Sequence, residues 1–267
     1  MSGPYRAVMI CDLNNPKSVQ YTKIARETFK KTKKIEIELW QCFVPETRRD
    51  SPYRYVWGGT DTRTKYAGQK RVIPQIEKAC LESHMYWWMH MARNNEQIII
   101  MEHDAYCRDI SKFEALVDQI DDHVLWNCGI AAECYTMNSS FAKYLRKLYL
   151  EDRVSISSGP MAEMFYHINI YHDKMLALGQ DIKPTLWPTE RRYTKKANQI
   201  RSARKPIDCL CKTNKFNVES APVTQCFNIS VGSTIEHPLP INLKHNPDVE
   251  FIDDERFSQL LKDSSFQ

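Results

Sequence analysis

The sequence lacks three features, and each absence argues against a class of protein. No uninterrupted apolar run approaches the roughly 20 residues that a membrane-spanning helix needs, which argues against an integral membrane protein. The first residues show no basic segment followed by an apolar stretch, so we expect no signal peptide. The nine cysteines form no CxxC pair and no metal-finger spacing, which predicts reduced, mostly buried thiols. We therefore expect a cytoplasmic protein, in the host cytoplasm if the source is viral.

Composition and charge indicate a folded domain with one unusual segment. Hydrophobic residues make up 42% of the 267 residues and charged residues 26%, which is ordinary for a globular protein and argues against wholesale disorder. The net charge is +4. Residues 183–215 contain ten Lys or Arg and only two acidic residues, a balance of +8 that leaves the rest of the chain at −4. The basic residues are therefore concentrated in one patch.

The opening of the chain predicts a strand, a helix and a second strand. The apolar run 6–11 ends in the turn 12–16, and Ser18 then caps a helix with regularly spaced apolar residues. Residues 35–39 alternate between apolar and charged side chains, as a half-buried strand does. With the usual right-handed crossover, this order makes a parallel sheet.

The remaining patterns extend this α/β arrangement. Apolar periodicity predicts further helices at 71–93, 111–120 and 139–149 and further strands at 98–101 and 123–126. We predict a mostly parallel sheet flanked by helices over residues 1–182. Residues 183–267 are expected to form an irregular, partly β, basic C-terminal extension that binds the acceptor or packs on the core. The polar segment 44–66 is a candidate lid, because such long loops are more often functional than decorative.

An apolar strand that ends in acidic residues suggests a metal site. Glu102 and Asp104 follow the strand directly, separated only by His103. Ligands of open α/β sheets bind outside the carboxyl ends of the strands, where Asp12 and Asn14 also lie, and two carboxylates there can hold Mg²⁺ or Mn²⁺. The spacing fits equally well with acidic residues that merely end a strand at a solvated turn.

The surrounding motifs resemble a known family. The chain has Cys80-x-x-Ser83-His84-x-x-x-Trp88 and then a strand ending in Glu102-x-Asp104. This pattern resembles the lipopolysaccharide-type glycosyltransferases, glycosyltransferase family 25. The similarity continues through Ala132-x-x-Tyr135 and Ser140-x-Ala142-x-x-x-Arg146. It covers residues 68–146 closely and 5–43 more loosely, and leaves the C-terminal third unmatched.

The resemblance implies a GT-A-like fold and a metal-dependent glycosyltransferase that uses a UDP-sugar. Asp104 and Glu102 then bind Mn²⁺ or Mg²⁺, while Ser83 and His84, with Asp12 and Asn14, are expected to support the donor. A histidine in an apolar helix stripe is, however, more often a core residue. Two features depart from the family: His103 replaces a central Asp, and Gly159-Pro160-Met161-Ala162-Glu163 stands where a Pro-x-Asp turn is usual.

Glycosyl transfer also needs a group that removes a proton from the attacking hydroxyl. A carboxylate is the usual solution when the anomeric centre inverts. Glu163 follows a predicted Gly-Pro turn and opens an aromatic stretch, so it is our candidate base. Asp104, through its metal, is the other candidate catalytic residue. An ordinary surface carboxylate explains Glu163 equally well.

The basic patch suggests an anionic acceptor. Its candidate acceptor-binding residues are Arg191, Arg192, Lys195, Lys196, Arg201 and Arg204. Such a stripe fits the phosphates of double-stranded DNA, because each contact releases counterions. Known cytoplasmic glycosyltransferases modify hydroxymethylated cytosine in bacteriophage DNA, so we expect that acceptor.

Reaching such a base requires base flipping, for which loop 44–66 offers cationic and aromatic residues: Arg48, Arg49, Tyr53, Arg54, Tyr55 and Trp57. Three alternatives to a DNA-modifying enzyme stay open. The patch can be a solvated basic face, the acceptor can be a glycan or lipopolysaccharide, or the whole protein can be a non-catalytic nucleic-acid-binding module.

Overall fold

The computed structural model describes most of the first 186 residues and parts of the remainder. The described residues are 3–51, 53, 60–61, 71–72, 75–129, 132–152, 160–183, 185–186, 221–228, 231 and 249–264. Among these residues, no helix is both long enough and apolar enough to cross a bilayer.

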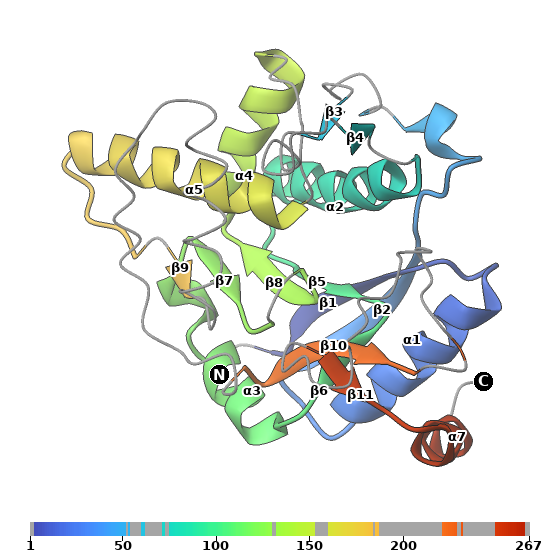
Figure 1. The fold of residues 1–267 in the computed structure, drawn as a ribbon. Helices are drawn as coiled ribbons and strands as arrows, with labels where there is room; N and C mark the ends of the chain where they lie inside the picture. The colour runs from blue at the N-terminus through green and yellow to red at the C-terminus, as the bar shows by residue number, and fades with distance from the viewer. Residues whose placement is uncertain are drawn as a thin grey trace.

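A six-stranded sheet forms the centre of the molecule (Figure 1). Its spatial order is β2-β1-β5-β8-β7-β9. The strands are β1 (Tyr5–Cys11), β2 (Ile35–Gln41), β5 (Ile99–Glu102), β7 (Leu125–Asn127), β8 (Cys134–Met137) and β9 (Thr185–Leu186). β1 pairs in parallel with β2 and β5, and β7 in parallel with β9, whereas β8 runs antiparallel to both neighbours. The predicted α/β class with a mostly parallel sheet is confirmed.

Helices cover both faces of this sheet (Figure 1). On one side lie α2 (Gln75–Asn94), α4 (Ser139–Arg146), which continues as a short π-helix (Lys147–Glu151), and α5 (Pro160–Ala177). On the other lie α1 (Pro16–Phe29) and α3 (Ile110–Val117), which is followed by a 3₁₀ turn (Ile120–Asp122). β1 shows why two layers are needed: Ala7 and Met9 pack toward α1 and α3, and Val8 and Ile10 toward α2.

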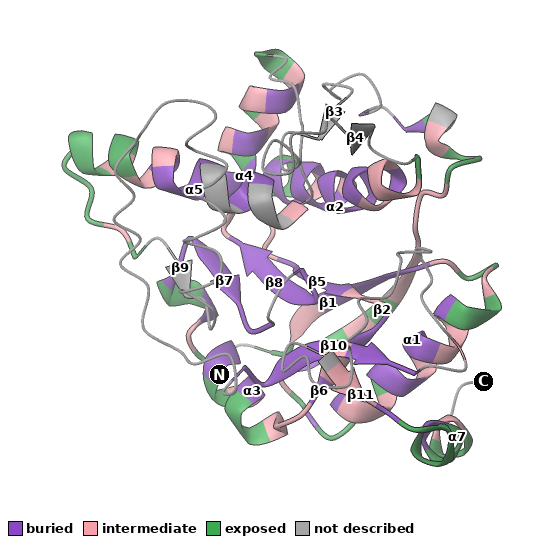
Figure 2. Cartoon of the chain, in the orientation of Figure 1, coloured by how far each residue is buried: buried purple, intermediate pink, exposed green. Residues whose placement is uncertain are grey.

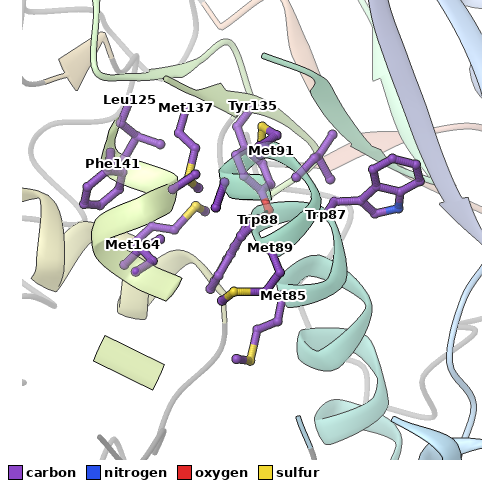
Figure 3. Close-up of a cluster of buried hydrophobic side chains, with 14 of the residues drawn as sticks. Met85, Trp87, Trp88, Met89, Met91, Leu125, Tyr135, Met137, Phe141 and Met164 are labelled. Atoms are coloured by element: carbon purple, nitrogen blue, oxygen red, sulfur yellow. Dashed lines mark hydrogen bonds between the residues drawn. The ribbon is translucent and has the colours of Figure 1, made fainter. Parts of the chain in front are cut away.

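The apolar stripe of α2 builds the larger core. Trp87, Trp88 and Met91 are buried there, as the spacing predicts. Figure 3 shows methionines of this helix facing residues from β7, β8, α4 and α5, namely Leu125, Met137, Phe141 and Met164. Burial of this layer fixes α2 above the carboxyl end of β5. The helix thereby carries its polar residues to the same edge of the sheet.

Two parts of the predicted C-terminal extension pack on the core. β10 (Val223–Phe227) pairs antiparallel with β6 (Ala105–Cys107) and parallel with β11 (Val249–Phe251), forming a three-stranded sheet. Helix α7 (Asp254–Asp263) buries Phe257 and Leu260 against Tyr21 and Ile24 of α1. Its outer surface is exposed (Figure 2). β10 therefore runs directly beside the turn that carries Asp104.

Some local predictions differ from the structure. α1 begins at Pro16 with Asn15 as its cap, because the Asn15 side chain accepts a hydrogen bond from the Lys17 amide. The predicted cap, Ser18, is three residues later and lies inside the helix, where its Oγ accepts from the Asp12 amide. α3 ends at Val117, earlier than predicted.

The predicted lid is also partly built into the fold. A 3₁₀ turn covers Arg48–Asp50, and Thr60–Asp61 (β3) pairs with Arg71–Val72 (β4). Tyr53 is buried, and Arg48 donates to the buried Glu82 at 2.6 Å. Both side chains are therefore engaged inside the protein, contrary to the expectation that they would be available to DNA. Arg54, Tyr55 and Trp57 lie outside the described residues.

Candidate donor site

A pocket lies where the carboxyl ends of β1, β2 and β5 meet. Its volume is about 710 Å³, a figure that includes the part open to solvent. The lining comes from these strand ends, from α1, α2 and from β10: Ile10, Asp12, Asn15, Ser18, Cys42, Phe43, Val44, Pro45, Ile76, Cys80, His84, Glu102, His103, Asp104 and Gln225. The sheet edge predicted to bind the ligand is therefore hollowed.

The turn after β1 forms one polar wall. The side chain of Gln41 donates to Asp12 Oδ1 at 3.1 Å, and the Asp12 amide donates to Ser18 Oγ at 3.0 Å. These bonds fix Asp12 at the pocket. Asn14, which the sequence also suggested, is exposed and does not line the pocket, whereas Asn15 does.

The turn after β5 supplies the two predicted metal ligands. The Glu102 side chain is one quarter exposed, and Asp104 is 8% exposed. Gln225 Nε2 donates to Asp104 Oδ2 at 2.8 Å, while Asp104 Oδ1 is buried and has no hydrogen-bond partner among the described residues. Burial raises the pKa of Asp104, and the Glu102 charge adds to the rise while His103 opposes it. A buried carboxylate oxygen without a partner fits a divalent cation, because the cation would supply the missing charge compensation.

Helix α2 contributes Ser83 behind the pocket wall. Ser83 Oγ accepts from the Phe43 amide at 2.9 Å and donates to the Ala79 carbonyl at 2.8 Å. Ser83 therefore does not line the pocket but holds the backbone of a residue that does. Its predicted role in donor support stays a prediction.

His84 and Cys80 lie on the same side of α2 as Ser83. His84 is fully buried, and its Nε2 lies 3.2 Å from Glu102 Oε1. This contact has the distance of an ion pair but not the alignment of a hydrogen bond, so within the described ranges Nε2 has no hydrogen-bond partner. Potential ligand atoms of Cys80, His84 and Glu102 lie within 4.8 Å of one another. Burial raises the pKa of the Cys80 thiol well above its ordinary value.

Glu163 lies elsewhere. It is on α5, only 3% exposed, and does not line the pocket. The Tyr149 hydroxyl donates to its Oε2 at 2.9 Å, and His167 Nε2 lies 3.6 Å from the same oxygen. The structure thus does not bring Glu163 to the candidate metal ligands. Because Glu163 is buried, the alternative interpretation as a surface carboxylate is wrong as well. The role of Glu163 as a base stays a prediction.

Comparison with known proteins identifies the family. The model of Glycosyltransferase family 25 (LPS biosynthesis protein) matches residues 17–179, which is more than half of the chain. The chain belongs to glycosyltransferase family 25. The predicted enzyme class, a glycosyltransferase, is thereby confirmed. Among curated proteins, none matches this family 25 member.

Two solved structures of the galactosyltransferase LgtC are similar to this family 25 member at low identity. One, in complex with donor and acceptor sugar analogs, is 12% identical with a TM-score of 0.40. The other, an active-site mutant, is 13% identical with a TM-score of 0.42. Each alignment covers 98% of this chain and 97% of the LgtC chain. These values are too low to support an inference about the site.

The family match ends before the basic patch. Arg191, Arg192, Lys195, Lys196, Arg201 and Arg204 lie outside the described residues. Gln225 is a pocket residue that contacts a predicted metal ligand and that sequence reasoning missed. It is 121 positions from Asp104, in a segment whose pattern is irregular, so no local signal could have linked the two.

Proposed function

We propose that this family 25 glycosyltransferase moves a sugar from a UDP-sugar to a hydroxyl group with the help of Mn²⁺ or Mg²⁺. The observation that carries the proposal is Asp104 Oδ1, a buried oxygen for which the described part of the chain offers no hydrogen-bond partner, in a pocket that also contains Glu102. Hard oxygen ligands of this kind suit a cation that also contacts diphosphate oxygens.

The residues of the pocket would have different roles. Glu102 and Asp104 would hold the cation, which when bound supplies a Lewis acid beside the departing diphosphate. The Gln225 amide fixes one oxygen of Asp104 and so limits the orientations of the carboxylate. Phe43, held by Ser83, belongs to an apolar wall that would exclude water from the donor.

For the acceptor we propose hydroxymethylated cytosine in double-stranded DNA, modified in the cytoplasm. The support is the charge distribution, with a balance of +8 over residues 183–215 in a chain of +4. The description of the family as an LPS biosynthesis protein favours the alternative acceptor, a glycan or lipopolysaccharide saccharide.

The test offers both acceptors in parallel. The protein is incubated with Mn²⁺, a panel of UDP-sugars, and either hydroxymethylated DNA or lipopolysaccharide saccharides, and the products are analysed by mass spectrometry. The proposal expects a hexose or pentose mass on the modified nucleoside, none on unmodified DNA, and none with Asp104→Asn. Transfer to the saccharide alone would replace the DNA acceptor by the glycan.

A charge variant tests the DNA contact separately. Replacing Arg191, Arg192, Lys195 and Lys196 together by Ala should weaken DNA binding and lower the slope of log affinity against log salt by about 0.9 for each lost phosphate contact. Hydrolysis of the donor should persist, because it needs no acceptor. An unchanged salt slope together with an unchanged rate of transfer to DNA would show that these residues form a solvated face.

A further inference from the structure

A chain of buried polar groups leads from the core to the pocket. Trp88 and His84 are four residues apart, so they lie on the same side of α2, and both contact Tyr135 of β8 (Figure 3 shows Trp88 and Tyr135). Trp88 Nε1 and His84 Nδ1 each lie 2.8 Å from the Tyr135 hydroxyl. The other ring nitrogen of His84 faces Glu102. All three core residues are fully buried, so water cannot replace these contacts.

The hydrogen inventory of these groups determines the tautomer of His84. The indole N–H of Trp88 can only donate, so the Tyr135 oxygen accepts from it. The Tyr135 hydroxyl proton then needs an acceptor, and in the described part of the chain His84 Nδ1 is its hydrogen-bonding neighbour. Burial raises the pKa of Tyr135 well above its ordinary value, which keeps that proton in place. Neutral His84 therefore carries its own proton on Nε2.

The Nε2–H group faces the candidate metal ligand. Nε2 lies 3.2 Å from Glu102 Oε1, a misaligned but close approach, and in the described part of the chain it has no hydrogen-bond partner. A buried N–H dipole this close to a carboxylate favours some orientations of that carboxylate over others. We propose that Tyr135 is a positioning residue, which sets the tautomer of His84 and through it orients Glu102 for metal binding. This role rests on the proposed function.

The same inventory argues against a competing site. Cys80, His84 and Glu102 are close enough together to suggest a zinc site. Zinc would need the lone pair of His84 Nε2, which moves the ring proton to Nδ1. The Tyr135 hydroxyl would then face an N–H group and lose its acceptor inside the core, which is unfavourable. The geometry therefore assigns His84 to orientation of Glu102 and not to coordination.

The tautomer can be measured without metal or donor. Protein labelled with ¹⁵N-histidine gives long-range ¹H–¹⁵N correlations, and the spectrum of His84→Gln identifies which of the eight histidines is His84. We expect the Nε2–H tautomer in the wild type and loss of that single tautomer in Tyr135→Phe. Tyr171→Phe, which removes another hydroxyl from the same core cluster, should leave the signal unchanged. An Nδ1–H tautomer in the wild type would overturn the proposal.

Metal affinity tests the consequence for Glu102. Tyr135→Phe and His84→Leu should each raise the Mn²⁺ Kd about 10- to 100-fold, whereas His84→Gln, which keeps an N–H donor, should retain most of the affinity. Wild-type affinity in Tyr135→Phe would contradict the positioning role. So would a cobalt–thiolate absorption band that disappears in Cys80→Ser, because it would show that the cluster binds a soft metal. If the wild type shows the predicted tautomer but binds no Mn²⁺, the proposed function is contradicted, and the positioning role of Tyr135 fails with it.

Discussion

Replacing Asp104 with Asn should separate folding stability from metal binding. Asp104 is 8% exposed, its Oδ2 accepts from Gln225, and none of the described residues hydrogen-bonds to its Oδ1. Asn keeps the shape of the side chain, and its carbonyl can still accept from Gln225. It removes the buried charge, however, and a buried amide costs less free energy than a buried carboxylate. Without metal, the variant should therefore be more stable than the wild type.

The size and the pH dependence of this gain follow from the burial. Asn places Nδ2 where Oδ1 was, so the gain comes from removing the buried charge. It is on the order of 1–3 kcal/mol, which corresponds to a change in Tm of about 2–6 °C for a chain of this length. Burial raises the pKa of Asp104 above its value in the unfolded chain, so the folded state holds the proton more tightly. The wild type accordingly loses stability as the pH rises from the unfolded pKa through the folded one, and the variant does not. The difference in Tm should grow from about pH 4 and then level off.

Scanning calorimetry across this pH range, with and without Mn²⁺, checks both effects. At about 100 times its Kd, a bound metal should stabilise the wild type by about 2.7 kcal/mol and the Asn variant by much less. Asp173→Asn, on the exposed side of α5, is the matched control and should behave as the wild type does. A variant that is less stable than the wild type at neutral pH without metal, or one that keeps the full Mn²⁺ shift, would refute this reasoning.

Three further substitutions test other parts of the site and fold. Gln225→Leu should raise the Mn²⁺ Kd about 10- to 100-fold in calorimetric titrations, because it removes the hydrogen bond to Asp104 Oδ2. The control Gln259→Leu, at an exposed position, should leave the Kd unchanged, and equal Mn²⁺ affinities of the two variants would rule out a positioning role for Gln225. Arg48→Met should lower the free energy of unfolding by about 1.5–3 kcal/mol in urea, because it removes an ion-pair partner of the buried Glu82 carboxylate; a loss below about 1 kcal/mol would contradict the contact. Glu163→Gln should lower the turnover rate by two to four orders of magnitude, with donor affinity unchanged, if the carboxylate is the base; a near-normal rate would remove it from catalysis.

Local patterns predicted the elements that carry the site. The apolar run of β1, the spacing of α1 and the alternation of β2 each record burial within one element, so a single sequence reveals them. The acidic turn after β5 was found for the same reason, because strand and carboxylates are adjacent in the sequence. Its place at the pocket follows from the general rule for parallel sheets.

Other features depend on contacts that a local pattern does not record. Whether Asn14 or Asn15 faces the pocket depends on the turn geometry, and the Asn15 cap fixes it. Gln225 reaches Asp104 only because β10 pairs with β6, which no periodicity in the C-terminal third announces. Glu163 looked exposed from its short-range surroundings, but Tyr149 and His167 enclose its carboxylate in the core. In each case a long-range or turn-specific contact decides the placement.

The most direct test of the central claim is a calorimetric titration of the protein with UDP, with Mn²⁺ and with a chelator in its place. If Glu102 and Asp104 hold a cation that contacts the diphosphate, the wild type should bind UDP at least about ten-fold, or about 1.4 kcal/mol, more tightly with Mn²⁺. Asp104→Asn should show no such difference. UDP affinity that is the same with and without Mn²⁺, or a metal dependence that persists undiminished in Asp104→Asn, would contradict the account of this pocket as the donor site.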